Sequence, residues 1–197
     1  MRKLIVHEFM SLDGVVQAPG GQDEDRDGGF AHGGWTVPYW HDDIGKAFLE
    51  AMQTVDAFLF GRRTYQIHGE AFEPMAPGDP FGDLMNAPKK YVVSRTLTKP
   101  IWRSTTIIRD NIAESVRSLK AQPGKDILSD GSSQLVPLLL EHDLVDELHL
   151  TLYPLTLGGG KRILPAGLHR EFRMTSAKSY PTGVVGLKYA RQESSKK

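Results

Sequence analysis

Short apolar runs recur through the first two-thirds of the chain, and each one ends at turn residues. The runs are Leu4 to Phe9, Ala57 to Phe60, Tyr91 to Val93, Ile107–Ile108 and Ile127–Leu128. Short, nearly continuous apolar runs are typical of strands that are covered on both faces. Two later segments, 148–153 and 185–189, alternate apolar and polar residues instead. Alternation predicts antiparallel strands with one wetter face.

Three helical patterns lie between these strands. Ile44, Phe48, Met52 and Val55 fall at helical spacing, with Asp42 or Asp43 as the expected N-cap. A second stripe runs through 112–119, and Asn111 with Glu114 has the spacing of a capping box. A third helix is expected over 135–142. It should begin near Ser133, because Pro137 must lie in its first turn. Alternating strands and helices followed by strands predict an α/β fold with a mixed sheet.

Composition narrows the classes of function. The chain has 197 residues and no cysteine, which excludes disulfides, thiolate metal sites and a cysteine nucleophile. Lys plus Arg and Asp plus Glu both number 24, so no large nucleic-acid footprint is expected. His7 and Glu8 interrupt the first apolar run, which argues against an export signal. We expect a cytoplasmic protein without a membrane span, with a single domain over 1–191 and a polar tail over 192–197.

Three weak motifs are interpreted without a ligand. Asp23-x-Asp25-x-Asp27 matches half of a calcium loop, but Gly34 stands where the loop needs a glutamate, so a solvated acidic loop is favoured. The run 158–161 lacks the spacing of a P-loop and is interpreted as a flexible turn. The histidines show no metal-ligand spacing, and no metal site is predicted.

Phosphate-binding side chains follow three of the apolar runs. Gly61-Arg62-Arg63-Thr64-Tyr65 comes directly after one run. If a helix begins there, its free N–H groups and both guanidinium groups favour an anion. The run Val93-Ser94-Arg95 and the glycine turn 130–133 repeat this arrangement. Ligands of open α/β sheets bind at the carboxyl ends of strands, so a ligand with several phosphates, such as a dinucleotide, is expected. The G-x-G-x-x-G fingerprint is absent, which disfavours the usual dinucleotide fold.

These residues resemble the dihydrofolate reductase fold. The similarity is greatest to small stand-alone relatives of the reductase domain of the riboflavin-biosynthesis deaminase–reductase, over roughly residues 2 to 190. The matching motifs are Phe9 to Gly14, Gly61 to Tyr65, Val93 to Arg95, Asp130 to Ser132, and the most specific pair, 144–148 with 154–160. The resemblance implies a mixed, mainly parallel sheet of about eight strands with helices on both faces. No deaminase half is expected within these 197 residues, because its zinc site needs cysteines.

The resemblance also implies hydride transfer from NADPH to a small heterocyclic or carbonyl substrate. The cofactor-binding residues would be Gly61, Arg62, Arg63, Thr64, Ser94, Arg95, Asp130, Gly131, Ser132 and Ser133. On the substrate side the candidates are Asp13, Trp40, Thr151 and Tyr153. Asp43 is the candidate acid, its pKa raised by an apolar neighbourhood, with Asp42 or a water as the alternative proton donor. Two alternatives stay open. One is a reductase of 5-amino-6-(5-phosphoribosylamino)uracil, with Lys161 and Arg162 on its phosphate; the other is a non-catalytic nucleotide-binding protein.

Two structural expectations come with this interpretation. By resemblance, the protein should be a homodimer that pairs through its late strands, with 148–153 as a candidate face. The long glycine-rich loop from Pro19 to Pro38 should form a lid over the nicotinamide end, using Phe30, Trp35 and Val37; a disordered insertion is the alternative. A second loop is expected from Glu73 to Pro88.

Overall fold

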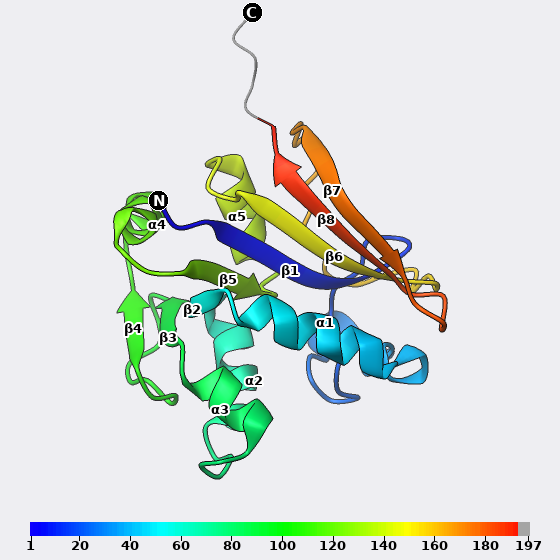
Figure 1. Ribbon diagram of the computed structural model, residues 1–197, viewed down its shortest axis with the longest axis horizontal. Helices are drawn as coiled ribbons and strands as arrows, with labels where there is room; N and C mark the ends of the chain where they lie inside the picture. Colours follow the sequence, from blue (N-terminus) through cyan, green and yellow to red (C-terminus); the bar gives the residue numbers. More distant parts are fainter. Residues whose placement is uncertain (193–197) are drawn as a thin grey trace, which may run out of the picture.

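A computed structural model describes residues 1–192 as one twisted eight-stranded sheet with helices against it (Figure 1). Residues 193–197, most of the expected tail, lie outside the described residues. The strands are β1 Leu4–Ser11, β2 Val55–Gly61, β3 Lys89–Val93, β4 Thr105–Ile108, β5 Asp126–Asp130, β6 Glu147–Tyr153, β7 Phe172–Ser179 and β8 Val185–Arg191. Their order is β4-β3-β2-β5-β1-β6-β8-β7. The pairs from β4 to β6 are parallel, and β8 is antiparallel to both β6 and β7. The predicted mixed, mainly parallel sheet is confirmed.

Two apolar layers cover the two faces of this sheet. Successive side chains of β1 show the division, because Leu4 and Val6 join one buried cluster while Ile5 joins the other. The first cluster packs against α4 (Ile112–Ala121) and α5 (Leu135–Glu141). The second packs against α1 (Asp42–Met52), α2 (Arg62–Phe72) and α3 (Pro80–Asn86). The parallel strands are therefore buried on both faces, which explains their continuous apolar runs.

The starts of the predicted helices differ in detail. The N-cap of α1 is His41, whose Nδ1 accepts the Asp43 N–H at 3.2 Å, so neither Asp42 nor Asp43 caps it. Asn111 precedes α4 in the left-handed conformation at φ 48° and makes no side-chain cap bond, so the capping box does not form. Helix α5 begins at Leu135, later than expected, with Pro137 in its first turn.

Two elements were missed by the pattern. Helix α3 interrupts the loop expected over 73–88, and Asp79 Oδ1 caps it by accepting the N–H groups of Phe81 and Gly82 at 3.0 and 2.7 Å. The Asp79-Pro80 pair is a helix start signal that the proline content obscured. Strand β7 went unnoticed because nearly all of its residues are exposed, so it carries no apolar alternation.

The segment from Pro19 to Pro38 is ordered by contacts rather than inserted loosely. Trp35 is buried, donates its Nε1–H to the Gln17 carbonyl at 2.8 Å, and meets the Tyr153 ring edge-on at 5.2 Å. Lys161 Nζ lies 2.5 Å from Asp25 Oδ2 and 2.9 Å from Asp27 Oδ2. Two short 3₁₀ turns, Asp27–Gly29 and Val37–Tyr39, complete it. Within residues 1–192, no group of three acidic or histidine side chains is arranged to hold a metal, and no helix is long and apolar enough to cross a membrane.

Candidate active site

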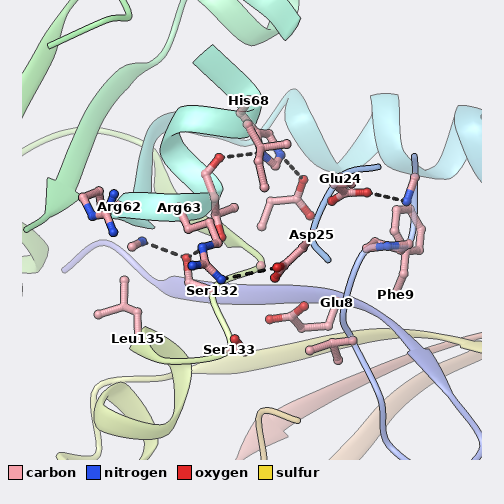
Figure 2. A pocket seen from close by; sticks show the side chains of 18 of the residues that line it. Glu8, Phe9, Glu24, Asp25, Arg62, Arg63, His68, Ser132, Ser133 and Leu135 are labelled. Atoms are coloured by element: carbon pink, nitrogen blue, oxygen red, sulfur yellow. Dashed lines mark hydrogen bonds and ion pairs between the residues drawn. The ribbon is translucent and has the colours of Figure 1, made fainter. Parts of the chain in front are cut away.

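A cavity of about 1050 Å³ opens at the carboxyl ends of the parallel strands. It is lined by residues of β1, α1, α2, the ends of β3 and β5, the start of α5 and the loop after β1. Every residue predicted to bind the cofactor lines it: Gly61, Arg62, Arg63, Thr64, Ser94, Arg95, Asp130, Gly131, Ser132 and Ser133. Figure 2 shows several of them around the cavity. The structure thus brings together side chains from three separate strand ends.

The junction of β2 and α2 forms a tight cradle with the turn after β5. Gly61 is the N-cap of α2 and donates its N–H to Ser132 Oγ at 2.7 Å, while Ser132 Oγ donates to Thr64 Oγ1 at 3.0 Å. A Cβ on Gly61 would lie 3.1 Å from Ser132 Oγ, so a larger residue would press on this contact. Gly131 has φ +87° and Ser132 φ 104°, conformations that side-chain-bearing residues rarely adopt. Such strain persists where the surrounding structure fixes it, often at ligand sites.

Arginines gather at this end of the cavity. Arg62 and Arg63 occupy the first turn of α2, where unpaired N–H groups and the helix dipole favour an anion. Arg62 Nη1 contacts only Gln66 Oε1 at 2.9 Å among its hydrogen bonds within residues 1–192, whereas Arg63 pairs with Asp25 at 3.3 Å and with Asp27. Arg95 is 79% exposed at the end of β3. Arg109, which the sequence analysis missed, also lines the cavity and donates to the Leu97 carbonyl at 3.0 Å.

Asp130 at the end of β5 is held between two histidines. Its Oδ1 accepts from His7 Nδ1 at 2.7 Å, and its Oδ2 lies 3.3 Å from His68 Nε2. Burial alone would raise the pKa of Asp130, but the hydrogen bonds and charges of His68 and His7 hold it well below its usual range. Burial lowers the pKa of His68, yet Asp130 and the Thr64 carbonyl more than offset this and raise it. Asp130 therefore organises the two histidines, and its charge is already matched.

Glu8 is a site residue that the sequence analysis missed. It comes from the middle of β1, lines the cavity and is only 4% exposed. Its Oε1 is buried and has no hydrogen-bond partner among the described residues. Burial raises the pKa of Glu8 well above its usual range, and the charge of Asp130 raises it further. The signal was present in the sequence: a glutamate inside a strand covered on both faces has no solvent side to occupy.

Apolar side chains of α1 and its neighbours form the remaining wall. Trp40, one of the predicted substrate residues, lines the cavity and is 53% exposed. Ile44, Phe48 and Leu49 of α1 follow it, and Phe72, Phe81 and Met85 continue the surface across α2 and α3. A wall of this kind suits a flat aromatic or heterocyclic ring.

The other predicted substrate residues lie outside this cavity. Tyr153 is fully buried among Phe9, Trp35 and Tyr39, and burial raises its pKa to about 12. Thr151 is 8% exposed, with Oγ1 3.4 Å from His7 Nε2. Both were expected on a wet strand face, but β6 is an inner strand whose face the loop after β1 and α1 cover.

Asp13 has a structural role instead of a substrate role. Its carboxylate accepts the Ser11 hydroxyl at 2.6 Å and the N–H groups of Leu157 and Gly158 at 3.1 and 2.8 Å. These bonds, with the Ser11 hydroxyl contributing most, lower the pKa of Asp13 to about 2. Asp13 thus fixes the turn that follows β6. These bonds explain the presence of an aspartate at this position without a bound ligand.

Asp43 does not have the environment expected of the acid. It is not among the residues that line the cavity, and its side chain is 42% exposed. The hydrogen bond from Lys46 Nζ at 3.2 Å lowers its pKa, so the expected rise is wrong. The N-terminal turn of α1 directs this carboxylate to solvent because the apolar stripe of the helix faces the sheet.

The loop after β1 contributes to the cavity through residues other than those expected. Pro19, Gly20, Glu24 and Asp25 line it, whereas Phe30, Trp35 and Val37 do not. Lys161 also lines the cavity, but Asp25 and Asp27 already pair with it. Arg162 points elsewhere and donates to the Asp13 carbonyl at 2.9 Å. The expected phosphate site of Lys161 and Arg162 is therefore not preformed.

Two proteins of Bacillus subtilis (strain 168) are similar to this chain in sequence. The chain is 29% identical over 192 residues to the uncharacterized protein YyaP of Bacillus subtilis (strain 168), covering 95% of this chain and 94% of that protein. It is 26% identical over 163 residues to YwjB, also uncharacterized and from the same organism, covering 81% of this chain and 80% of YwjB.

Solved structures share the fold at low sequence identity. A protein of Shewanella sp. PV-4, provisionally assigned to riboflavin biosynthesis, superposes with a TM-score of 0.75 at 19% identity, covering 97% of this chain and 99% of that one. A pyrimidine reductase-like protein from Corynebacterium diphtheriae superposes with a TM-score of 0.69 at 13% sequence identity, covering 98% of this chain and 92% of that one. A dihydrofolate reductase from Enterococcus faecalis, complexed with NADP(H) and RAB-propyl, superposes with a TM-score of 0.63 at 14% sequence identity, covering 97% of each chain. These likenesses establish a dihydrofolate reductase-like fold.

A family model identifies the lineage within that fold. The model of the RibD C-terminal domain matches residues 2–186, which includes strands β1 to β7, the start of β8 and every residue of the cavity. This chain belongs to the RibD C-terminal domain family.

Proposed function

We propose that this protein is an NADPH-dependent reductase that transfers a hydride to a small heterocyclic or carbonyl substrate, of the riboflavin-precursor or pterin type. The observation that carries the proposal is the convergence of Arg62, Arg63, Arg95 and the Gly61–Thr64–Ser132 cradle in one cavity with an aromatic wall. Membership of the RibD C-terminal domain family supports an oxidoreductase, and one neighbour of the same fold is complexed with NADP(H).

The residues present fit a nicotinamide dinucleotide phosphate. The first turn of α2 and its arginines offer donors to the phosphates, and Gly131 leaves room beside Thr64, where a Cβ would approach Thr64 Cγ2 to 3.3 Å. Arg62, Ser94 and Arg95 would hold the 2′-phosphate, and Gly131, Ser132 and Ser133 would lie along the pyrophosphate. The bound cofactor would supply the hydride, while the protein orients it and keeps water away.

A more specific candidate is reduction of 5-amino-6-(5-phosphoribosylamino)uracil. One structural neighbour is a pyrimidine reductase-like protein, and another is assigned to riboflavin biosynthesis, which favours this substrate. Lys161 is the cavity cation that would bind the substrate phosphate. The phosphate would first have to displace Asp25 or Asp27 from it. A pterin lacks this phosphate and needs no such displacement.

Cofactor titration and turnover test these proposals together. Fluorescence titration should give a dissociation constant at least about ten-fold lower for NADPH than for NADH, because charge-assisted bonds to the 2′-phosphate contribute roughly 1.5–3 kcal/mol. NADPH oxidation with 5-amino-6-(5-phosphoribosylamino)uracil or 7,8-dihydrofolate identifies the substrate type. Equal affinity for both cofactors contradicts the NADPH assignment. Tight NADPH binding with neither substrate reduced favours a nucleotide-binding protein.

We further propose that the protein is a homodimer that pairs through β7. The expected face over 148–153 is wrong, because β6 lies between β1 and β8 and most of its side chains are buried. Strand β7 is instead the exposed edge of the sheet, with Met174 55% exposed. Sedimentation should show twice the chain mass of 21.9 kDa at micromolar concentration, and a clean monomer would contradict the pairing.

A further inference from the structure

Glu8 is the one acidic side chain of the cavity whose buried oxygen has no hydrogen-bond partner within residues 1–192. It extends from β1 into the cavity in Figure 2 and is 4% exposed. Buried polar side chains are hydrogen-bonded in the large majority of cases, and an unpartnered one calls for an explanation. A structural role for the Glu8 carboxyl would require a bond that the protein does not supply.

The charged groups around Glu8 do not compensate a negative charge there. Asp130 on β5 adds repulsion, and it already engages His7 and His68. Asp25 and Glu24 come from the loop after β1, and Glu24 Oε2 accepts the N–H groups of Gly20 and Gly21 at 2.7 and 2.9 Å. Two cations on this side, Lys161 on the loop after β6 and Arg63 on α2, line the cavity, and both are paired with Asp25 and Asp27. Glu8 therefore lies in an acidic, desolvated part of the cavity, where its neutral form is favoured.

A neutral carboxyl offers an O–H donor as well as an acceptor. We propose that Glu8 is the acid of this cavity, donating its proton to the ring or imine nitrogen, or the carbonyl oxygen, of a bound substrate. The proposal rests on the proposed function. It also supplies the proton donor that Asp43 cannot be, since Asp43 lies outside the cavity and pairs with Lys46.

In a C=N or C=O acceptor, the substrate carbon gains a C–H bond from the hydride, and the π electron pair moves to the nitrogen or oxygen. That atom takes the Glu8 proton as the carboxyl O–H bond breaks, leaving a carboxylate that a solvent proton neutralises. The substrate is reduced and NADPH, the reductant of the proposed function, is oxidised to NADP⁺. General acid catalysis by a positioned side chain typically contributes about 10²–10⁴-fold.

The first test needs no substrate. Infrared difference spectra between wild-type protein and Glu8→Gln at pH 7 should show the C=O band of a protonated carboxyl that only the wild type has. Glu50→Gln, at an exposed position of α1 outside the cavity, is the matched control and should leave that band in place. A wild-type spectrum without the band at pH 7 overturns the proposal, whether or not either variant folds.

The second test separates this proposal from the proposed function. NADPH binding is titrated, and turnover is measured with 5-amino-6-(5-phosphoribosylamino)uracil and 7,8-dihydrofolate. Glu8→Gln should lower kcat about 100-fold or more and remove the alkaline limb of its pH profile, where Glu8 loses its proton, while the NADPH dissociation constant stays within about two-fold. Unchanged kcat with normal NADPH binding overturns the role of Glu8 alone. NADPH binding without any wild-type turnover also overturns it and leaves the cofactor site standing, whereas absent NADPH binding overturns the proposed function and the role together.

Discussion

The two ends of the cavity differ in how their side chains are paired. At the α2 end, Arg62 in the first turn of α2 and Arg95 after β3 have few partners and are accessible to a ligand. At the β1 end, Asp130 is enclosed by two histidines and Glu8 is buried without a partner. The first end resembles an anion site built from surface-accessible donors, and the second a desolvated site that controls protons. A single cavity thus presents cationic donors at one end and a desolvated carboxyl at the other.

Breaking the Asp130 pairing should produce the largest effect. Asp130→Asn leaves His7 and His68 without their shared carboxylate, and removal of one partner from a buried pair typically destabilises by about 3–5 kcal/mol. Urea unfolding at pH 6 measures this loss. Asp126→Asn, at the opposite end of β5, is the comparison; equal midpoints for the two variants would show that the histidine pairing contributes little.

Removing the guanidinium of Arg62, at the α2 end of the cavity, should weaken the binding of NADPH selectively. Arg62→Ala should weaken NADPH binding roughly 10- to 100-fold, since one charge-assisted bond contributes about 1.5–3 kcal/mol, and should change NADH binding little. Fluorescence titration of both cofactors measures the ratio. Arg117→Ala, at an exposed position of α4 outside the cavity, is the matched control. A parallel loss for NADPH and NADH would place Arg62 away from the 2′-phosphate.

The free energy of unfolding should depend on pH between the pKa of Glu8 in the unfolded chain and its higher pKa in the folded protein. The folded pKa of Glu8 is raised above its usual 4.5, so the folded state binds the proton more tightly than the unfolded chain. The contribution of Glu8 to the free energy of unfolding is then fully present below pH 4.5. It is lost as pH rises towards the folded pKa, by at most about 1.4 kcal/mol per pH unit.

Comparison with Glu8→Gln isolates this contribution from that of His68. His68 also has a raised pKa, so its stabilisation is lost in the same direction, but only as pH rises above 6.5. Denaturant unfolding from pH 5 to 8 should give a flatter profile for the variant, and the difference from wild type is due to Glu8. Parallel profiles would mean that Glu8 is ionised in the folded protein.

The smallest effect is expected at Asp43. Asp43→Asn removes an exposed pair with Lys46, and exposed pairs of this kind contribute little. Turnover should stay within about three-fold of wild type, in contrast to the loss expected for Glu8→Gln. A 100-fold loss of kcat in Asp43→Asn would return the acid to α1 and remove the distinction drawn between the two carboxyls.

The sequence by itself determined the sheet and the convergence of the candidate phosphate donors in one cavity. Parallel strands bring their carboxyl ends to one edge, so donors placed after strands, such as Arg62, Ser94 and Ser132, must converge whatever the details of packing. The succession of apolar runs and the polar residues that follow them along the chain is enough for that prediction. The resemblance to the riboflavin reductase domain led to the same family, which the family model confirmed.

Only the tertiary structure decided the acidic end. The burial of a side chain depends on what covers its strand, and Tyr153 is covered by Trp35, which is 118 residues earlier in the chain. Glu8 and Asp130 share the cavity because β1 pairs with β5, and His7 meets Asp130 through the same register. The electrostatic field at a carboxyl is the sum over such long-range neighbours. Residue type and spacing therefore located the candidate phosphate donors, whereas the burial that raises the pKa of Glu8 is produced only by the packed structure.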